Sequence, residues 1–188
     1  MKTEKLFDYV VLGGGIVGVS TALSLIKAHP NKTILLVEKE RSFAQHQTGH
    51  NSGVIHAGVY YQPGSLKAQF CREGLKATIE FCTINKIPYE QCGKLLVATS
   101  KIELSRMNKI YEKCVANQIE VEILNQKQLS DIEPNVLGIG ALLIKSTGIV
   151  NYQMITDKMV EQFEALGGKY LLNTEIVNLE ELTEEIKI

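Results

Sequence analysis

The sequence predicts an α/β protein, and two observations support this prediction. First, an apolar run at residues 9–12 is followed by three closely spaced glycines, a helical pattern and a second apolar run at residues 33–37. Second, strand-like and helical patterns continue to follow one another as far as residue 179. The first region is expected to form a strand, helix, strand unit of a parallel sheet.

The glycines explain how the first strand passes into the helix. Gly13, Gly15 and Gly18 have the spacing G-x-G-x-x-G. Gly13 permits a tight turn, Gly15 lets a pyrophosphate approach the backbone, and Gly18 lets the helix pack close to the sheet. The helix, expected over residues 16–28, directs free N–H groups and its positive dipole end toward such a phosphate.

An acidic residue completes the pattern. Glu38 ends the second strand, about 20 residues after the glycines, where a carboxylate accepts hydrogen bonds from an adenosine ribose. It would repel a 2′-phosphate, so NADP is disfavoured. An ordinary βαβ turn is the alternative, but the whole succession in register favours a Rossmann-like dinucleotide-binding domain.

The rest of the chain continues with regular elements. Ser65 begins a helix to residue 84 with an apolar face, Ser100 and Glu103 are expected to form a capping box, and Asn151 begins another helix. The apolar face of the first of these helices carries Leu66, Phe70, Ala77, Phe81 and Ile84, and that of the last carries Ile155, Met159, Phe163 and Leu166. Strands are expected at residues 94–99, 120–124, 139–144, 169–172 and 175–179, helices at 100–116 and 151–166, and a helical turn at 127–131.

Composition excludes several classes of protein. The chain has 45% hydrophobic residues and a net charge of −1, and its basic residues form no runs that would bind nucleic acid. No apolar stretch reaches the ~20 residues of a membrane span, and the first residues do not resemble a secretory signal, so we expect a cytoplasmic protein. The cysteines have no metal-site or redox-pair spacing, and we expect buried free thiols at Cys71, Cys82, Cys92 and Cys114.

Residues 48–61, Thr-Gly-His-Asn-Ser-Gly-Val-Ile-His-Ala-Gly-Val-Tyr-Tyr, are the most unusual segment. Three glycines within ten positions indicate a backbone that another group approaches closely. A glycine-rich surface connection is the alternative.

Together these patterns resemble a known family. The fingerprint Gly13 to Gly18 with Glu38, and the later Thr147-Gly148-Ile149-Val150 before a helix, resemble the D-amino-acid-oxidase-like superfamily of FAD enzymes. Within it, the segment from His50 to Tyr61, continued by Pro63-Gly64-Ser65-Leu66-Lys67-Ala68 and Cys71-Arg72-Glu73-Gly74, resembles L-2-hydroxyglutarate oxidases and dehydrogenases.

The resemblance implies a domain organisation. Residues 1–85 and 146–188 would belong to a Rossmann-like FAD-binding domain, and residues 86–145 to part of an inserted α+β substrate domain. Enzymes of this family are about twice as long, so the chain resembles their N-terminal half. We therefore expect residues 1–188 alone to fold poorly and to have no turnover.

The resemblance also implies a reaction and its site. The enzyme would oxidise L-2-hydroxyglutarate to 2-oxoglutarate with FAD as the hydride acceptor. His56, with His50 second, is the candidate proton acceptor, although a lone histidine is often structural. The candidate FAD contacts after the fingerprint are Asn51, Ser52 and Gly53, and the candidate substrate contacts are Tyr60, Lys67 and Arg72. Each of the last three also has a structural interpretation, as a core tyrosine or as solvated cations.

Two other functions remain open. One is a different activity in the same superfamily, on a glycerol phosphate or an amine, and the other is an inactive nucleotide-binding remnant. Neither the oligomeric state nor the electron acceptor follows from the sequence. The acceptor would be oxygen or a membrane quinone, and a quinone would place the enzyme at the inner membrane surface. No metal site is expected.

Overall fold

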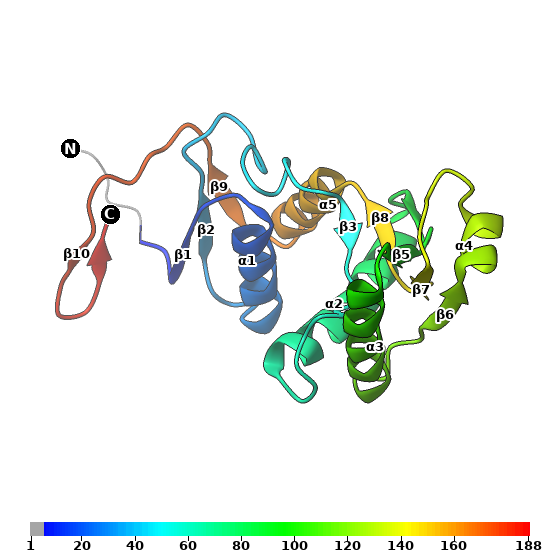
Figure 1. Cartoon of the computed structure of the whole chain (residues 1–188). Helices are drawn as coiled ribbons and strands as arrows, with labels where there is room; N and C mark the ends of the chain where they lie inside the picture. The colour runs from blue at the N-terminus through cyan, green and yellow to red at the C-terminus, as the bar shows by residue number, and fades with distance from the viewer. Residues whose placement is uncertain (1–5) are drawn as a thin grey trace. The chain divides into compact units, whose positions relative to one another are not determined.

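A computed structural model describes residues 6–188, and Figure 1 shows its helices and strands. The chain forms two units: unit 1 runs to Ser52 and resumes at Asn151–Ile188, and unit 2 is Gly53–Val150. This division differs from the ranges that we expected, because residues 53–85 belong to unit 2. The assignment of 1–85 and 146–188 to FAD binding, and of 86–145 to substrate binding, stays a prediction.

Unit 1 is built on a parallel sheet with the strand order β1-β2-β9. Leu12 pairs with Val37, and Val37 with Leu171, so the carboxyl ends of the three strands meet at one edge. The elements are β1 (Tyr9–Leu12), α1 (Ile16–Ala28), β2 (Ile34–Val37), α5 (Tyr152–Ala165) and β9 (Lys169–Leu171). The predicted strand, helix, strand unit is confirmed.

Helices α1 and α5 cover one face of this sheet and form its core. Val19, Ala22 and Ile26 of α1 pack with Ile34 and Leu36 of β2. Val160 and Phe163 of α5 complete the cluster. The apolar face predicted for α5 is confirmed at Ile155 and Phe163, but Leu166 ends the helix and is exposed, so its predicted place on that face is wrong.

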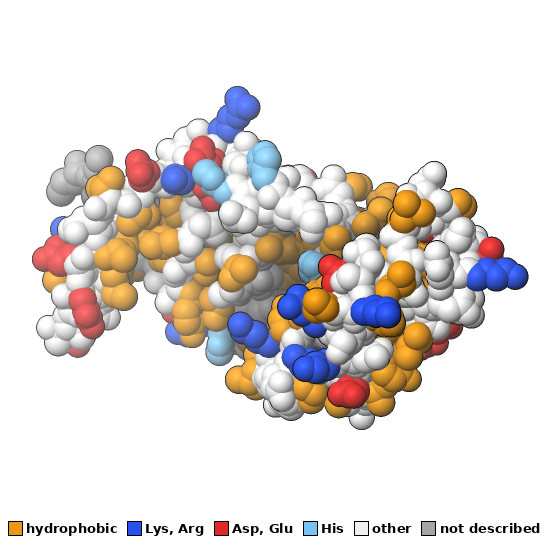
Figure 2. Space-filling model, in the orientation of Figure 1, with side chains coloured by type: hydrophobic (Ala, Val, Ile, Leu, Met, Phe, Trp, Pro, Cys, Tyr) orange, Lys and Arg blue, Asp and Glu red, His pale blue; other side chains and the backbone are white. Residues whose placement is uncertain are grey.

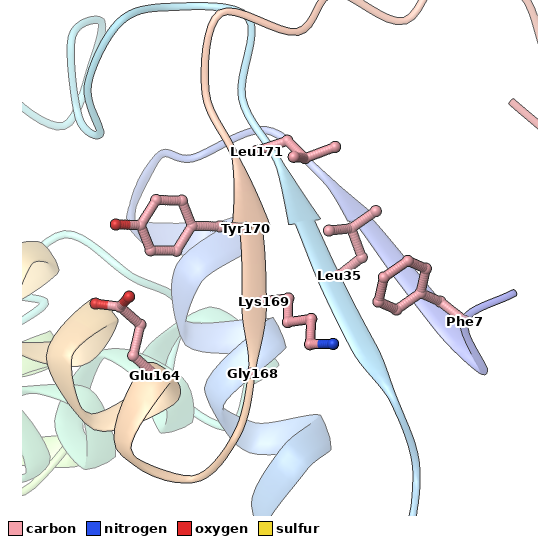
Figure 3. Close-up of a pocket in the computed structure, with 7 residues that line it drawn as sticks. All are labelled: Phe7, Leu35, Glu164, Gly168, Lys169, Tyr170 and Leu171. Atoms are coloured by element: carbon pink, nitrogen blue, oxygen red, sulfur yellow. The ribbon is translucent and has the colours of Figure 1, made fainter. Parts of the chain in front are cut away.

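The other face of the sheet is open. Val10 and Leu12 retain 37% and 46% of their accessible surface, so β1 is covered on one face only within the described residues, although parallel strands are usually buried on both faces. Figure 3 shows Phe7, Leu35 and Leu171 on this side, with Tyr170 pointing to the other. They line a depression of about 380 Å³. Figure 2 shows hydrophobic side chains gathered at the surface around β1.

Unit 1 ends in a small hairpin of β10 (Glu180–Glu181) and β11 (Ile186–Lys187). The strand predicted at residues 175–179 is absent, because this segment has no neighbouring strand to pair with in the structure. Val177 and Leu179 are exposed.

Unit 2 contains two small sheets and three helices. Its larger sheet is antiparallel, with the order β5-β7-β6, and the smaller has the order β3-β8-β4. The elements are β3 (Val54–Ile55), α2 (Leu66–Asn85), β4 (Tyr89–Glu90), β5 (Lys94–Ala98), α3 (Lys101–Ala116), β6 (Glu122–Asn125), α4 (Gln126–Ile132), β7 (Gly140–Ile144) and β8 (Gly148–Val150).

The core of unit 2 joins its larger sheet to α3 and to the chain after β3. Ala98, Leu142 and Ile144 of the sheet pack with Met107 and Cys114 of α3. Ala57 and Val59 enter the same cluster from the chain after β3. This packing fixes the backbone around residues 56–61.

The apolar face predicted for α2 is not buried. Leu66, Phe70 and Ile84 keep more than 60% of their accessible surface, at 67%, 63% and 69%. Helical spacing was right about the element but wrong about burial, because spacing shows which residues share a face and not what covers it.

Two local predictions also need correction. Ser100 accepts from the Glu103 N–H at 3.3 Å, but the Glu103 carboxylate accepts from Thr99 N–H instead of Ser100 N–H, so the capping box is incomplete. All four cysteines are free, but only Cys82 and Cys114 are buried; Cys71 is half-buried and Cys92 exposed. Across residues 6–188, no helix has both the length and the apolar character that crossing a membrane requires.

Candidate functional site

The glycine turn after β1 has the geometry that its sequence predicts. Gly13 has φ +102°, in the region that favours glycine, and its N–H donates to Val37 O at 2.8 Å. A Cβ on Gly18 would collide with Gly13 O. Gly18 is therefore the position at which α1 approaches the turn most closely.

The N-terminus of α1 is bare apart from one hydroxyl. Gly15 is the N-cap and supplies no side-chain cap. Thr48 Oγ1 accepts from Ile16 N–H at 2.9 Å, and Ala44 N–H donates to Gly14 O at 3.0 Å. The segment after β2, residues 39–52, thus folds back onto the glycine turn, and we call it the return segment. The sequence pattern indicates no role for Thr48 or Ala44 at this turn. Only Thr48 lies in the glycine-rich segment, and nothing in the pattern indicates a contact across 32 residues.

Glu38 lies at the centre of this turn. It is 7% exposed, its Oε2 accepts from Gly14 N–H at 2.5 Å, and its Oε1 accepts from Glu40 N–H at 2.8 Å. A Cβ on Gly14 would lie 2.9 Å from Oε2 and 2.5 Å from Phe43 Cδ1, so a side chain there would displace the acid. Each carboxylate oxygen has a second lone pair for a ribose hydroxyl.

The geometry of the glycine turn can be compared with the groups that a dinucleotide presents. A left-handed glycine, a helix N-terminus without a side-chain cap and a buried acid at the adjacent strand end lie within one connected network. Such a network suits a pyrophosphate and a ribose. The residues therefore fit the group that the sequence predicts.

The predicted residues between Glu38 and Gly53 lie on the same return segment. Asn51 Nδ2 donates to Thr48 O at 2.7 Å and to Gln47 O at 3.1 Å, which stiffens the turn that carries Thr48. His50 is exposed, and its Nδ1 lies 3.1 Å from His46 O. Ser52 is exposed at the end of unit 1.

The remaining predicted residues lie in unit 2. Gly53 has φ +66°, and its carbonyl accepts from Val150 N–H at 2.8 Å. His56 is exposed just after β3, and its carbonyl accepts from Cys71 Sγ at 3.2 Å. The structure brings Gly13, Gly15, Gly18 and Glu38 together in unit 1, and His56 and Tyr60 onto one loop of unit 2.

The candidate substrate contacts have different surroundings. Tyr60 is exposed, and Lys94 Nζ lies 5.0 Å from the centre of its ring, a cation–π contact. Lys67 is exposed on α2. Arg72 donates from Nη1 to Asn117 O at 3.5 Å, beyond the last turn of α3, where a cation interacts favourably with the helix dipole. The structure thus gives Arg72 a partner within unit 2.

Two further observations concern the surroundings of the predicted site residues. The depression lined by residues of β2, β9 and α5 contains none of the predicted site residues, so we assign it no part in the site. Within residues 6–188, no three His, Cys, Asp or Glu side chains are grouped as metal ligands would be.

The chain matches a protein-family model. Residues 8–187 match the DAO family, described as FAD dependent oxidoreductase. The match covers almost the whole chain. The expected cofactor, FAD, and the expected fold class are confirmed at the level of this family.

Curated relatives share high identity with the chain. It is 52% identical over 176 residues to L-2-hydroxyglutarate dehydrogenase of Escherichia coli K12, covering 94% of this chain and 42% of that protein. It is 42% identical over 175 residues to the mitochondrial L-2-hydroxyglutarate dehydrogenase of Homo sapiens, covering 93% and 38%. The chain spans about two fifths of the length of these relatives.

Solved structures show the same fold. The L-α-glycerophosphate oxidase of Mycoplasma pneumoniae, with FAD bound, has a TM-score of 0.88 at 25% identity, covering 96% of this chain and 48% of that one. The glycine oxidase of Geobacillus kaustophilus has a TM-score of 0.81 at 17% identity, covering 93% and 48%. None of these comparisons tests the individual site residues, whose roles stay predictions.

Proposed function

Because the chain belongs to the DAO family of FAD-dependent oxidoreductases, we propose that it is the N-terminal part of an enzyme that oxidises L-2-hydroxyglutarate to 2-oxoglutarate. The observation that carries this proposal is the 52% identity over 94% of the chain to an L-2-hydroxyglutarate dehydrogenase. In this reaction the substrate loses a hydride from C2 and a proton from its hydroxyl. FAD, when bound, supplies the acceptor for the hydride.

Unit 1 holds the cofactor in this proposal. The turn with Gly13, Gly15 and Gly18 and the N-terminus of α1 bind the pyrophosphate, and Glu38 accepts from the ribose hydroxyls. The backbone and short side chains at Asn51 and Ser52, together with Gly53, the first residue of unit 2, contact the flavin end. Thr48 keeps the return segment against α1.

Unit 2 acts on the substrate. His56 accepts the hydroxyl proton, and the second candidate, His50, lies in unit 1. Tyr60 and Lys67 bind the substrate carboxylates, and Arg72 adds positive charge beside them. A dicarboxylate needs cations at both ends, because a carboxylate left unpaired in a partly desolvated site lowers affinity.

The substrate assignment is tested by anaerobic flavin reduction. Protein extended to the length of its relatives and carrying its flavin is mixed with L-2-hydroxyglutarate, and bleaching of the flavin absorbance is expected. The D enantiomer should not bleach it, since reversal at C2 turns the hydrogen away when both carboxylates stay bound. Glycerol 3-phosphate is the second candidate substrate, because the fold matches that of the glycerophosphate oxidase. Faster flavin reduction by glycerol 3-phosphate or by glycine would refute L-2-hydroxyglutarate as the substrate.

The role of His56 is tested with matched histidine variants. His56→Ala should lower the rate of flavin reduction by about 10²-fold or more while substrate affinity and flavin content stay unchanged. His46→Ala is the control, because His46 is exposed and its Nε2 lies 2.9 Å from Glu40 Oε1. Loss of flavin or of folding in His56→Ala would make His56 structural.

The electron acceptor and location form part of the proposal. The enzyme is cytoplasmic and passes its electrons to oxygen or to a membrane quinone at the inner membrane surface. Reoxidation of the reduced flavin is measured with oxygen and with a soluble quinone. A rate with quinone that exceeds the rate with oxygen supports the membrane surface, and the reverse order supports oxygen.

A further inference from the structure

Residues 56–61 of unit 2 form a loop whose backbone is held by side chains from two helices. Cys71 of α2 donates to His56 O at 3.2 Å. Cys114 of α3 lies with its Sγ 4.0 Å from Val59 O, and Asn117, just after α3, donates from Nδ2 to Tyr61 O at 3.0 Å. We call these three side chains the loop clamp.

The side chains of this loop alternate between the core and solvent. Ala57 and Val59 are buried in the cluster with Met107 and Cys114, whereas His56 and Tyr60 are exposed. Fixing the backbone therefore also fixes the direction in which the two exposed side chains leave it.

Asn117 is the strongest member of the loop clamp. It is 7% exposed, and it uses three groups at once: its N–H donates to Lys113 O at 2.9 Å, its carbonyl accepts from Arg72, and its side-chain amide holds Tyr61. A thiol is a weak donor, so the two cysteines contribute less than this amide. Without the Asn117 side-chain amide, Tyr61 O would lose this hydrogen-bond donor.

We propose that Asn117 is a positioning residue, which holds the end of the 56–61 loop and thereby orients His56 and Tyr60. This proposal rests on the proposed function in one respect only, the groups that the two side chains contact. These groups are the hydroxyl and a carboxylate of a 2-hydroxy diacid. Asn117 itself touches neither.

The four cysteines of the chain report on this role without cofactor or substrate. Cys71 is covered by the loop, since a Cβ on Gly58 would lie 3.1 Å from its Sγ. Burial raises the pKa of the Cys71 and Cys114 thiols, which slows their alkylation. Cys92 is exposed, so its labelling rate serves as the internal reference for the activity of the reagent. Cys82 is fully buried, so its labelling rate serves as the internal reference for opening of the whole unit.

The first experiment measures iodoacetamide labelling of each cysteine by mass spectrometry. Asn117→Ala should raise the labelling rate of Cys71 about fivefold, the equilibrium factor of one net hydrogen bond, with Cys92 and Cys82 unchanged. Asn117→Leu, which keeps the branched shape of the side chain and removes the donor, should give the same increase. Asn125→Ala is the control, since it removes an asparagine that caps α4 in the same unit and contacts no part of the loop.

An unchanged Cys71 rate in both Asn117 variants would overturn the proposal. An equal rise at Cys82 would also overturn it, because unit 2 would then be opening as a whole. Asn125→Ala should leave the rate at Cys71 at the wild-type value. An increase there equal to that of Asn117→Ala would reduce Asn117 to a general stabiliser.

The second experiment connects the loop to the reaction. In flavin-loaded protein extended to the length of its relatives, Asn117→Ala should slow flavin reduction by L-2-hydroxyglutarate about fivefold with flavin content unchanged, and the Asn125→Ala rate should stay at the wild-type value. A normal rate in Asn117→Ala, despite faster Cys71 labelling, would refute orientation of His56. If the wild type does not react with this substrate, the proposed function fails, while the labelling rates still decide whether Asn117 holds the loop.

Discussion

The glycine turn of unit 1 and the 56–61 loop of unit 2 are both fixed backbone segments, but they are fixed in different ways. The turn is determined by its own glycines and by Glu38 at the end of the next strand, 24 residues from Gly14. The loop is held by cysteine and asparagine side chains as far as 55 and 56 residues away. A turn determined by local residue types has a sequence pattern, whereas a loop held by distant side chains has none.

The largest expected effect comes from closing the space at the glycine turn. Gly18→Ala should destabilise unit 1 by about 3 kcal/mol or more, because its Cβ would collide with Gly13 O and the backbone of α1 would have to move. Thermal melting measures the change. Gly74→Ala is the control: Gly74 is helical, no atom lies within 4 Å of its added Cβ, and the helix should gain about 1 kcal/mol. Equal melting temperatures for Gly18→Ala and wild type would contradict the close approach.

The second effect separates cofactor binding from folding at the same turn. Glu38→Ala removes an acceptor of the Gly14 and Glu40 N–H groups and of the ribose hydroxyls, so flavin affinity should fall by about 1.5–3 kcal/mol, roughly 10- to 100-fold. Quenching of flavin fluorescence on binding gives the dissociation constant. Glu40→Ala, which removes a carboxylate that pairs with His46, should bind flavin normally. An unchanged constant in Glu38→Ala would exclude Glu38 from the site.

The contrast between the two segments explains how far the sequence could be interpreted. The strand, helix and second strand of unit 1 were predicted because apolar periodicity and the glycine spacing are local. Exposure of the α2 face at Leu66 and Phe70, and the missing strand at 175–179, were not, since burial and strand pairing depend on partners distant in sequence. Asn117 had no signal beyond the end of a helix.

The third prediction concerns the loop and distinguishes crowding from backbone strain. Gly58 has φ +82° and an added Cβ would lie 3.1 Å from Cys71 Sγ, whereas Gly64 has φ +77° with no atom within 4 Å. Gly64→Ala should cost about 1 kcal/mol for strain alone, and Gly58→Ala about 2 kcal/mol for strain and crowding together. Urea unfolding curves measure both. If Gly64→Ala cost as much as Gly58→Ala, contact with Cys71 would contribute nothing to the loop.

The smallest expected effect lies at the start of unit 1, away from both segments, and depends on pH. Asp8 accepts from Lys32 Nζ at 2.8 Å and from Thr33 N–H at 2.7 Å, and these bonds lower the pKa of Asp8 far below its usual range. Because the folded pKa lies below the unfolded value of about 3.9, the charged pair stabilises unit 1 above that pH, and the contribution disappears as pH falls below it.

Lys32, whose pKa is raised by Asp8, keeps its charge throughout this range. Asp8→Asn should therefore lower the melting temperature slightly between pH 5 and 8, with the difference from wild type shrinking as the pH approaches 2. The effect is small because both side chains are partly in water. Asp131→Asn, at an exposed aspartate of α4 for which residues 6–188 show no ion pair, is the control and should change little at any pH. A difference for Asp8→Asn that grows on acidification would contradict the ion pair, since protonation of the carboxylate abolishes the charge that the substitution removes.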